Sequence, residues 1–120
     1  MSGAGFTQSI DDKGVLHVVF DLPGERVNLL NATILEGLSR LLDEARGRDD
    51  VRAVLFSSAK PDVFLAGMDV EQIGSVRDSY QAAEGARRGQ AVFQQIAELG
   101  KPSACAINGT CAGGGYELAL

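Results

Sequence analysis

Hydrophobic residues recur with two different periods along this chain, and each period predicts a different kind of element. Residues 14–23, GVLHVVFDLP, carry a β-branched and aromatic run between a turn-like stretch at 11–14 and a Pro-Gly pair at 23–24. This pattern predicts a strand. The preceding FTQSI, residues 6–10, is expected to pair with it in a hairpin that turns at residues 11–14.

From Asn31 the apolar spacing changes to three and four, which is typical of one face of an α-helix. Asn31 is a good N-cap and the polar stretch RGRDD ends the element. We therefore expect a helix whose apolar face is Ile34, Leu35, Leu38, Leu41, Leu42 and Ala45. The next stretch, VRAVLFSSA at 51–59, is a short and nearly continuous apolar run. Such a run is typical of a strand in a sheet that is covered on both faces.

The second half of the chain predicts two more helices and one more strand. A loop over residues 57–69 leads into a short helix from Asp69 through Ile73, and a longer helix follows over residues 79–99. The expected apolar stripe of the longer helix is Ala82, Ala86, Phe93, Ile96 and Leu99, with Arg87 and Arg88 off it. A Lys-Pro pair ends this helix, SACAI at 103–107 is expected to be a buried strand, and an Asn-Gly pair opens a glycine-rich loop. No linker divides the chain, so we expect one α/β domain.

Composition narrows the possible partners. The formal net charge is −5, with acidic and basic residues interleaved, which argues against broad nucleic-acid binding. No apolar run approaches the roughly 18–20 residues of a membrane span, and the first residues lack the regions of a secretory signal, so a cytoplasmic protein is expected. Cys105, Cys111 and the single histidine, His17, are too few and too scattered for a metal site. We expect both cysteines to be free thiols that serve as packing residues.

Two loops combine the residues that chemistry would need. FLAGMD and GTCAGGG each follow a predicted strand and lead into a predicted helix, so each offers backbone N–H groups at a helix N-terminus. Two such donors can grip one developing negative oxygen, and glycine at 113–115 would leave room for that ligand. Glu117 follows within one turn and suits a general acid or base. Taken alone, the glycines also fit a structural loop, and Glu117 a carboxylate that balances the helix dipole.

Together these stretches resemble the crotonase superfamily, the enoyl-CoA hydratase/isomerase family. The resemblance rests on AVLFSSAKPDVFLAGMDVEQI, KPSACAINGTCAGGGYELAL and, more loosely, PGERVNLLNATILEGL. It is greatest to the amino-terminal hydratase module of the multifunctional fatty-acid oxidation complex α-subunit. The resemblance implies a crotonase-like spiral of ββα units. Residues 1–120 would form the amino-terminal part of one such domain, about half its usual length, and would leave a sheet edge and apolar helix faces uncovered.

The resemblance also implies residue roles. The backbone N–H groups of Met68 and Gly114 would hold the thioester oxygen, although the family most often has alanine where this chain has Met68. Glu117 matches the first of two catalytic glutamates, and the second would lie about twenty residues further along, beyond Leu120. Ala66, Gly67 and Asp69 would line the coenzyme A groove with their backbone, and Gly113 would also contact the substrate. By its position, Asp69 is better interpreted as the N-cap of the short helix than as a catalytic acid.

The implied activity is hydration of a trans-2-enoyl-CoA in fatty-acid β-oxidation, with 3-enoyl-CoA isomerisation as a second reaction. No cofactor is implied, because coenzyme A is part of the substrate. The implied assembly is a homo-oligomer (trimer or hexamer) or a fatty-acid oxidation complex. The alternatives are another thioester reaction on the same fold, such as hydrolysis, dehalogenation or condensation, and a non-catalytic binding fragment.

Few positively charged residues are candidates for binding the phosphates of coenzyme A. Arg26 is at a place where the family often has a basic residue, and it fits a solvated surface charge equally well. Lys60 and Lys101 are weaker candidates, for which a surface role is preferred.

We interpret His17 as a solvent-facing or hydrogen-bonded strand residue, because no acid or nucleophile stands beside it in the sequence.

Overall fold

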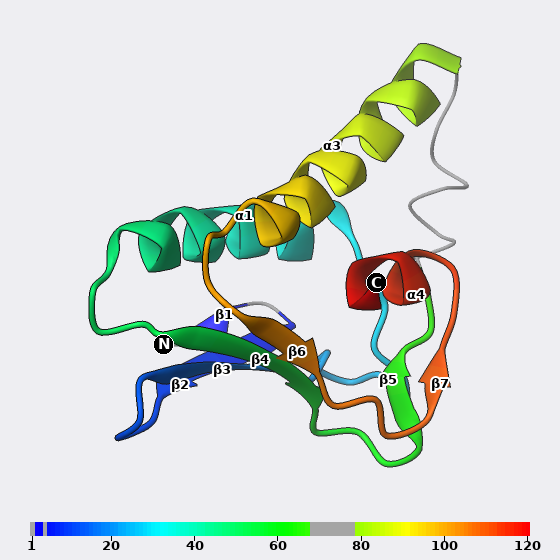
Figure 1. The fold of residues 1–120 in the computed structure, drawn as a ribbon. Helices are drawn as coiled ribbons and strands as arrows, with labels where there is room; N and C mark the ends of the chain where they lie inside the picture. The colour runs from blue at the N-terminus through cyan, green and yellow to red at the C-terminus, as the bar shows by residue number, and fades with distance from the viewer. Residues whose placement is uncertain (1, 4, 68–78) are drawn as a thin grey trace.

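The computed structural model describes residues 2–3, 5–67 and 79–120, with only the backbone at 2–3 and 79–83. A five-stranded sheet has the order β1 (Ser2–Gly3), β2 (Phe6–Ile10), β3 (Val15–Phe20), β4 (Ala53–Ser58) and β6 (Ser103–Cys105). Helices α1 (Ala32–Gly47) and α3 (Ser79–Ala97) lie together over one face of this sheet (Figure 1). Beside it stand a two-stranded sheet, β5 (Val63–Leu65) with β7 (Thr110–Cys111), and the short helix α4 (Gly114–Ala119).

The predicted hairpin is confirmed. β2 and β3 pair antiparallel with Gln8 opposite Val18, and the turn between them is closed by the Gly14 N–H, which donates to the Asp11 carbonyl (3.1 Å). β3 then pairs parallel with β4, and β4 pairs parallel with β6. Parallel neighbours bring the carboxyl ends of these strands to one end of the sheet, from which the chain continues into β5 after β4 and into β7 after β6.

The predicted first helix is also confirmed, down to its cap and its buried face. The Asn31 side chain accepts a hydrogen bond from the Ile34 N–H (2.8 Å), as an N-cap does. The buried residues of α1 are Ile34, Leu35, Leu38, Leu41, Leu42 and Ala45, the same six that the apolar spacing selects. Gln95 of α3 donates to the Ser39 carbonyl and to the Asp43 carboxylate, which ties the two helices together.

The structure corrects two expectations about the burial of strands. SACAI is not a buried strand, because β6 is the last strand in the sheet order and Ser103 and Ala104 are exposed. The strand β4 is not covered on both faces: Val54 and Phe56 are buried against the helices, whereas alternate residues such as Leu55 are only partly buried. A strand with helices on one side buries every second residue.

The apolar stripe of α3 also differs from the prediction. Ala86 is exposed, and Val92, which the predicted stripe omits, is buried. Leu99 is buried just beyond the helix, while Phe93 and Ile96 are partly buried. The side chain of Ala82 and the short helix expected from Asp69 lie outside the described residues. Only the last turns of α3 therefore pack on the core, in agreement with its course in Figure 1, where its first turns extend beyond the sheet.

Two strands in loops that the pattern left irregular join distant parts of the chain. β5 and β7 pair in parallel, with Val63 opposite Thr110 and Leu65 opposite Cys111. Phe64 ties this pair to the main core, because its ring meets the Phe20 ring edge-on at 5.9 Å between centroids. The small sheet thus has a fixed place beside the large one.

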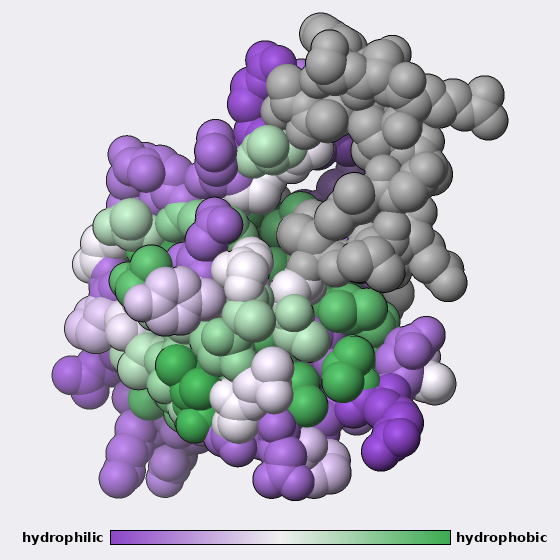
Figure 2. Space-filling model, turned by 90° about the vertical axis from the view of Figure 1, so that its right-hand side faces the viewer, coloured by the Kyte–Doolittle hydropathy of each residue, from purple (hydrophilic) through white to green (hydrophobic). Residues whose placement is uncertain are grey.

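Hydrophobic surface is exposed where α4 and β7 lie. Ile107 is 53% exposed and Leu120 86% exposed. Figure 2, which faces this side of the molecule, shows green surface gathered below the grey residues. In the described part of the chain, β6 is an edge strand of the five-stranded sheet. Within the described segments, no helix is both long and apolar enough to cross a bilayer.

Candidate functional site

The two glycine-bearing loops, which follow β5 and β7 and carry Gly67 and Gly113, lie side by side. Beyond the β5–β7 pairing, the Ala112 N–H donates to the Leu65 carbonyl at 3.1 Å. One residue further along each loop, a Cβ added to Gly113 would lie 3.8 Å from the Gly67 Cα. Backbone from two segments more than forty residues apart in the sequence therefore lies so close that a single added methyl group would span the space between them.

Gly113 and Gly115 are required for different reasons. Gly113 is the N-cap of α4 with φ 53° and ψ −126°, a conformation that side chains disfavour. Gly115 is buried, and a Cβ there would lie 2.4 Å from the Leu65 Cβ and 2.6 Å from its carbonyl oxygen. The first glycine makes the turn, and the other lets α4 lie against β5.

In the first turn of α4, one backbone donor is left without a partner among the described residues. The N–H groups of Gly115 and Tyr116 both point back to the Ala112 carbonyl, and that of Glu117 donates to the Gly113 carbonyl at 3.1 Å. Over the described residues, the Gly114 N–H has no hydrogen-bond partner. An unpaired amide in the first helical turn is a donor for an anionic or carbonyl oxygen.

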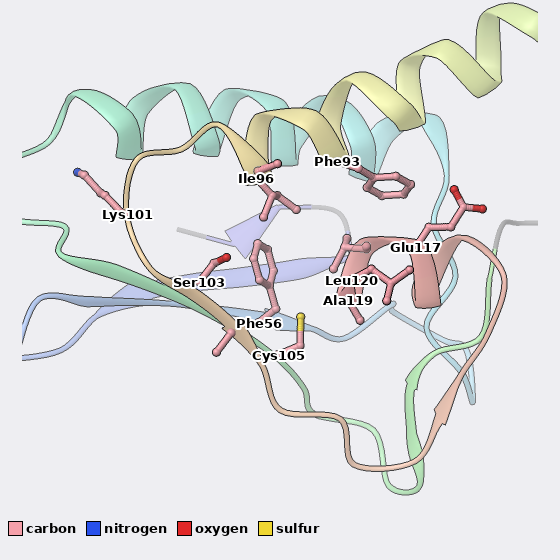
Figure 3. A pocket seen from close by; sticks show the side chains of 12 residues that line it. Phe56, Phe93, Ile96, Lys101, Ser103, Cys105, Glu117, Ala119 and Leu120 are labelled. Carbon is pink, nitrogen blue, oxygen red and sulfur yellow. The ribbon is translucent and has the colours of Figure 1, made fainter.

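Glu117 lies one helical turn beyond this amide and lines a pocket of about 240 Å³. Figure 3 shows its carboxylate extending from α4 on the side that faces α3. The side chain is exposed and makes no hydrogen bond or ion pair with any described residue. It is therefore free to act on a ligand.

Most of the other residues that line this pocket are apolar in type, and they come mainly from four elements, β4, α3, β6 and α4. Its lining includes Phe56 of β4, Phe93 and Ile96 of α3, and Leu118 of α4. Cys105 of β6 also lines it (Figure 3). Burial, and secondarily the neighbouring Cys111, raises the pKa of the Cys105 thiol to about 11. A neutral thiol among apolar side chains is a packing group, and both cysteines are free, in agreement with the expectation.

The three candidate residues for binding phosphate, Arg26, Lys60 and Lys101, differ in whether their charged groups already have partners. The Lys60 ammonium pairs with the Asp21 carboxylate at 2.9 Å and donates to the Leu22 carbonyl at 2.8 Å. The Lys101 ammonium donates to the Ala45 and Arg48 carbonyls, so it caps the C-terminus of α1. Arg26 is exposed and has no partner in the described part of the chain. Of the three, Arg26 is the cation left available.

One buried polar residue, Asn28, has no role predicted from the sequence pattern. It is 1% exposed, and its side chain bonds to three separate segments. The available signal was a single asparagine set among Val27, Leu29 and Leu30, where a polar side chain has to find partners inside the protein. His17, interpreted from the sequence as a solvent-facing or hydrogen-bonded strand residue, is hydrogen-bonded to Asp11 on the exposed hairpin (2.9 Å), which confirms that interpretation.

Comparison with known proteins places this geometry in a family. The family model described as enoyl-CoA hydratase/isomerase matches residues 11–120. The chain belongs to the enoyl-CoA hydratase/isomerase family. It is 40% identical over 115 residues to the fatty acid oxidation complex subunit alpha of Idiomarina loihiensis, covering 96% of this chain and 16% of that protein.

Solved structures share the fold of this chain. Pseudomonas aeruginosa DspI has a TM-score of 0.86 at 28% identity, covering 96% of this chain and 46% of that one. An enoyl-CoA hydratase from Geobacillus kaustophilus has a TM-score of 0.90 at 18% identity, covering 99% of this chain and 44% of that one. The predicted crotonase fold is confirmed. The chain spans under half the length of these two structures and a sixth of the curated relative.

Apart from Arg26, the predicted site residues fall into two groups. Ala66, Gly67, Gly113, Gly114 and Glu117 lie within the described segments, on the two adjoining loops and the first turn of α4. Met68 and Asp69 lie outside the described residues. No group of three or more His, Cys, Asp and Glu side chains in the described part of the chain is arranged to hold a metal ion.

Proposed function

We propose that this chain forms the thioester-activating half of an enoyl-CoA hydratase site. The observation that carries the proposal is the meeting of two glycine-bearing loops at the N-terminus of α4, with the Gly114 N–H unpaired and Glu117 one turn away. Membership of the enoyl-CoA hydratase/isomerase family suggests which reaction this geometry would catalyse. The relative named as a fatty acid oxidation complex subunit supports a place in β-oxidation and in a larger assembly.

Hydration of an enoyl thioester places negative charge on the thioester oxygen as water attacks. In the proposed site, the Gly114 N–H and the N–H of Met68 donate to that oxygen. Fixed donors of this kind do not have to reorganise during the reaction, and the loss of one typically costs about 3–4 kcal/mol of transition-state stabilisation. Glu117, paired with a second carboxylate beyond Leu120, takes or supplies the proton that water addition requires.

Arg26 is the proposed contact for the phosphates of coenzyme A, since the ammonium groups of Lys60 and Lys101 already have partners. The backbone of Ala66, Gly67, Asp69 and Gly113 is proposed to line the pantetheine and adenine groove. Gly67 and Gly113 suit this role because they expose main chain that no Cβ covers.

The test is incubation of the protein with crotonyl-CoA while the conjugated-thioester absorbance is followed. Hydration removes this absorbance without releasing a thiol, and Glu117→Gln is expected to slow it about 100-fold or more while CoA-ester affinity changes less than about threefold. Glu36→Gln is the matched control, because Glu36 is exposed on α1 and does not line the pocket. Appearance of a free thiol would show thioester hydrolysis instead. Binding without any loss of absorbance would favour a binding fragment.

A further inference from the structure

Asn28 joins the segment before α1 to the loop that carries Gly67. Its Nδ2 donates to the Ser58 Oγ (2.8 Å) and to the Phe64 carbonyl (2.9 Å), and its Oδ1 accepts from the Leu22 N–H (3.1 Å). Its backbone carbonyl accepts from the Ala66 N–H at 2.9 Å. Among the described residues, Asn28 is the buried polar side chain of the core. Three of the four hydrogen bonds that an asparagine side chain can make are present.

The contacts of Asn28 hold the glycine loop at two consecutive points. Its side chain binds the carbonyl of Phe64 in β5, and its backbone binds the N–H of Ala66 directly after β5. Two residues later, the Leu30 N–H donates to the Gly67 carbonyl at 2.8 Å. The N–H of Met68, the donor proposed from the first loop, belongs to the same peptide unit as this carbonyl.

We propose that Asn28 is a positioning residue for the thioester site, which fixes the loop from Phe64 to Gly67 against α4 so that its backbone can polarise the thioester carbonyl. This inference rests on the proposed function. A buried amide with three partners resists displacement, because moving the loop would leave polar groups unpaired away from water. The loop has no other side-chain anchor of this kind among the described residues.

Asn28→Asp is the decisive variant because it keeps the shape of the side chain and the acceptor for Leu22. The Ser58 hydroxyl can turn to donate to the new oxygen, whereas the Phe64 carbonyl loses its donor. The matched control is Gln95→Ala, which removes a side-chain amide with two acceptors between α1 and α3, away from the loop. Ser58→Ala, which removes only one of the two acceptors of Nδ2, serves as the second variant if Asn28→Asp does not fold.

The readout is the absorption spectrum of a bound dimethylaminocinnamoyl-CoA, whose band moves to longer wavelength when its thioester carbonyl accepts hydrogen bonds. The unaltered chain and Gln95→Ala are expected to give the same shift. Asn28→Asp is expected to lose at least half of it, and Ser58→Ala a smaller part, with dissociation constants within about threefold of the parent. A full shift in folded Asn28→Asp, or in Ser58→Ala if it is the variant that folds, overturns the positioning role alone. The absence of any shift in the unaltered chain overturns the proposed function, and this inference with it.

Discussion

Gly115→Ala tests whether the contact between α4 and β5 is as close as the structure has it. The new methyl group would lie 2.4 Å from the Leu65 Cβ and 2.6 Å from the Leu65 carbonyl oxygen. Carbon atoms pack at about 3.5–4.0 Å, so at least about 1 Å of separation would have to be created. The Leu65 carbonyl is itself held by the Ala112 N–H at 3.1 Å. Neither side can move without breaking the junction of the two loops.

The expected change in the free energy of unfolding is the difference between two opposing effects. Alanine favours a helix over glycine by about 1 kcal/mol, which alone would stabilise the protein. Overpacking against backbone costs typically about 1–3 kcal/mol, and the contact with a hydrogen-bonded carbonyl places it at the upper end. We therefore expect a net loss of about 2 kcal/mol in the free energy of unfolding. For a domain of this size that lowers Tm by roughly 8 °C.

The assay is urea and thermal unfolding followed by far-UV circular dichroism. The control is Gly85→Ala in α3, where an added Cβ would have no heavy atom within 4 Å. This control is expected to gain up to about 1 kcal/mol from helix propensity alone. If Gly115→Ala is as stable as the parent, or gains as much as Gly85→Ala, the close approach of α4 to β5 is refuted.

Three further predictions concern single residues. Asn31→Ala should lower the free energy of unfolding by about 1 kcal/mol through loss of the α1 cap, and an unchanged urea midpoint would contradict this. Hydrogen bonds, the strongest from His17, hold the pKa of Asp11 below its ordinary value in the folded protein. The His17–Asp11 pair therefore stabilises the fold fully above the unfolded-state pKa of about 3.9, and this stabilisation is lost as the pH falls through the pKa of Asp11 in the folded protein. His17→Ala should raise the Asp11 pKa in an NMR titration, and an unmoved titration curve would count against the pair. Because burial raises the pKa of Cys105 to about 11, its alkylation at pH 8 should be at least about tenfold slower than that of a cysteine peptide, and rapid labelling would exclude that environment.

Local pattern determined much of the fold. The three-and-four spacing after Asn31 selected all six buried residues of α1, and β-branched residues between turn signals selected β3 and its hairpin. Both signals succeed because the period of an element decides which side chains share a face, whatever that face packs against. The sequence around the two glycine-bearing loops, which carry Gly67 and Gly113, was also sufficient to identify the family.

Only the tertiary structure decided how distant segments meet. Thr110 and Cys111 gave no strand signal, because β7 has two residues and exists by pairing with β5, more than forty residues earlier in the chain. Whether β6 is buried depends on its position in the sheet order, and the apolar residues of β6 do not determine that position. Asn28 likewise acquires its role from partners on three other segments. Periodicity records which face of an element is apolar, while the neighbour of that face is set by packing of the whole chain, and the candidate site is built from such neighbours.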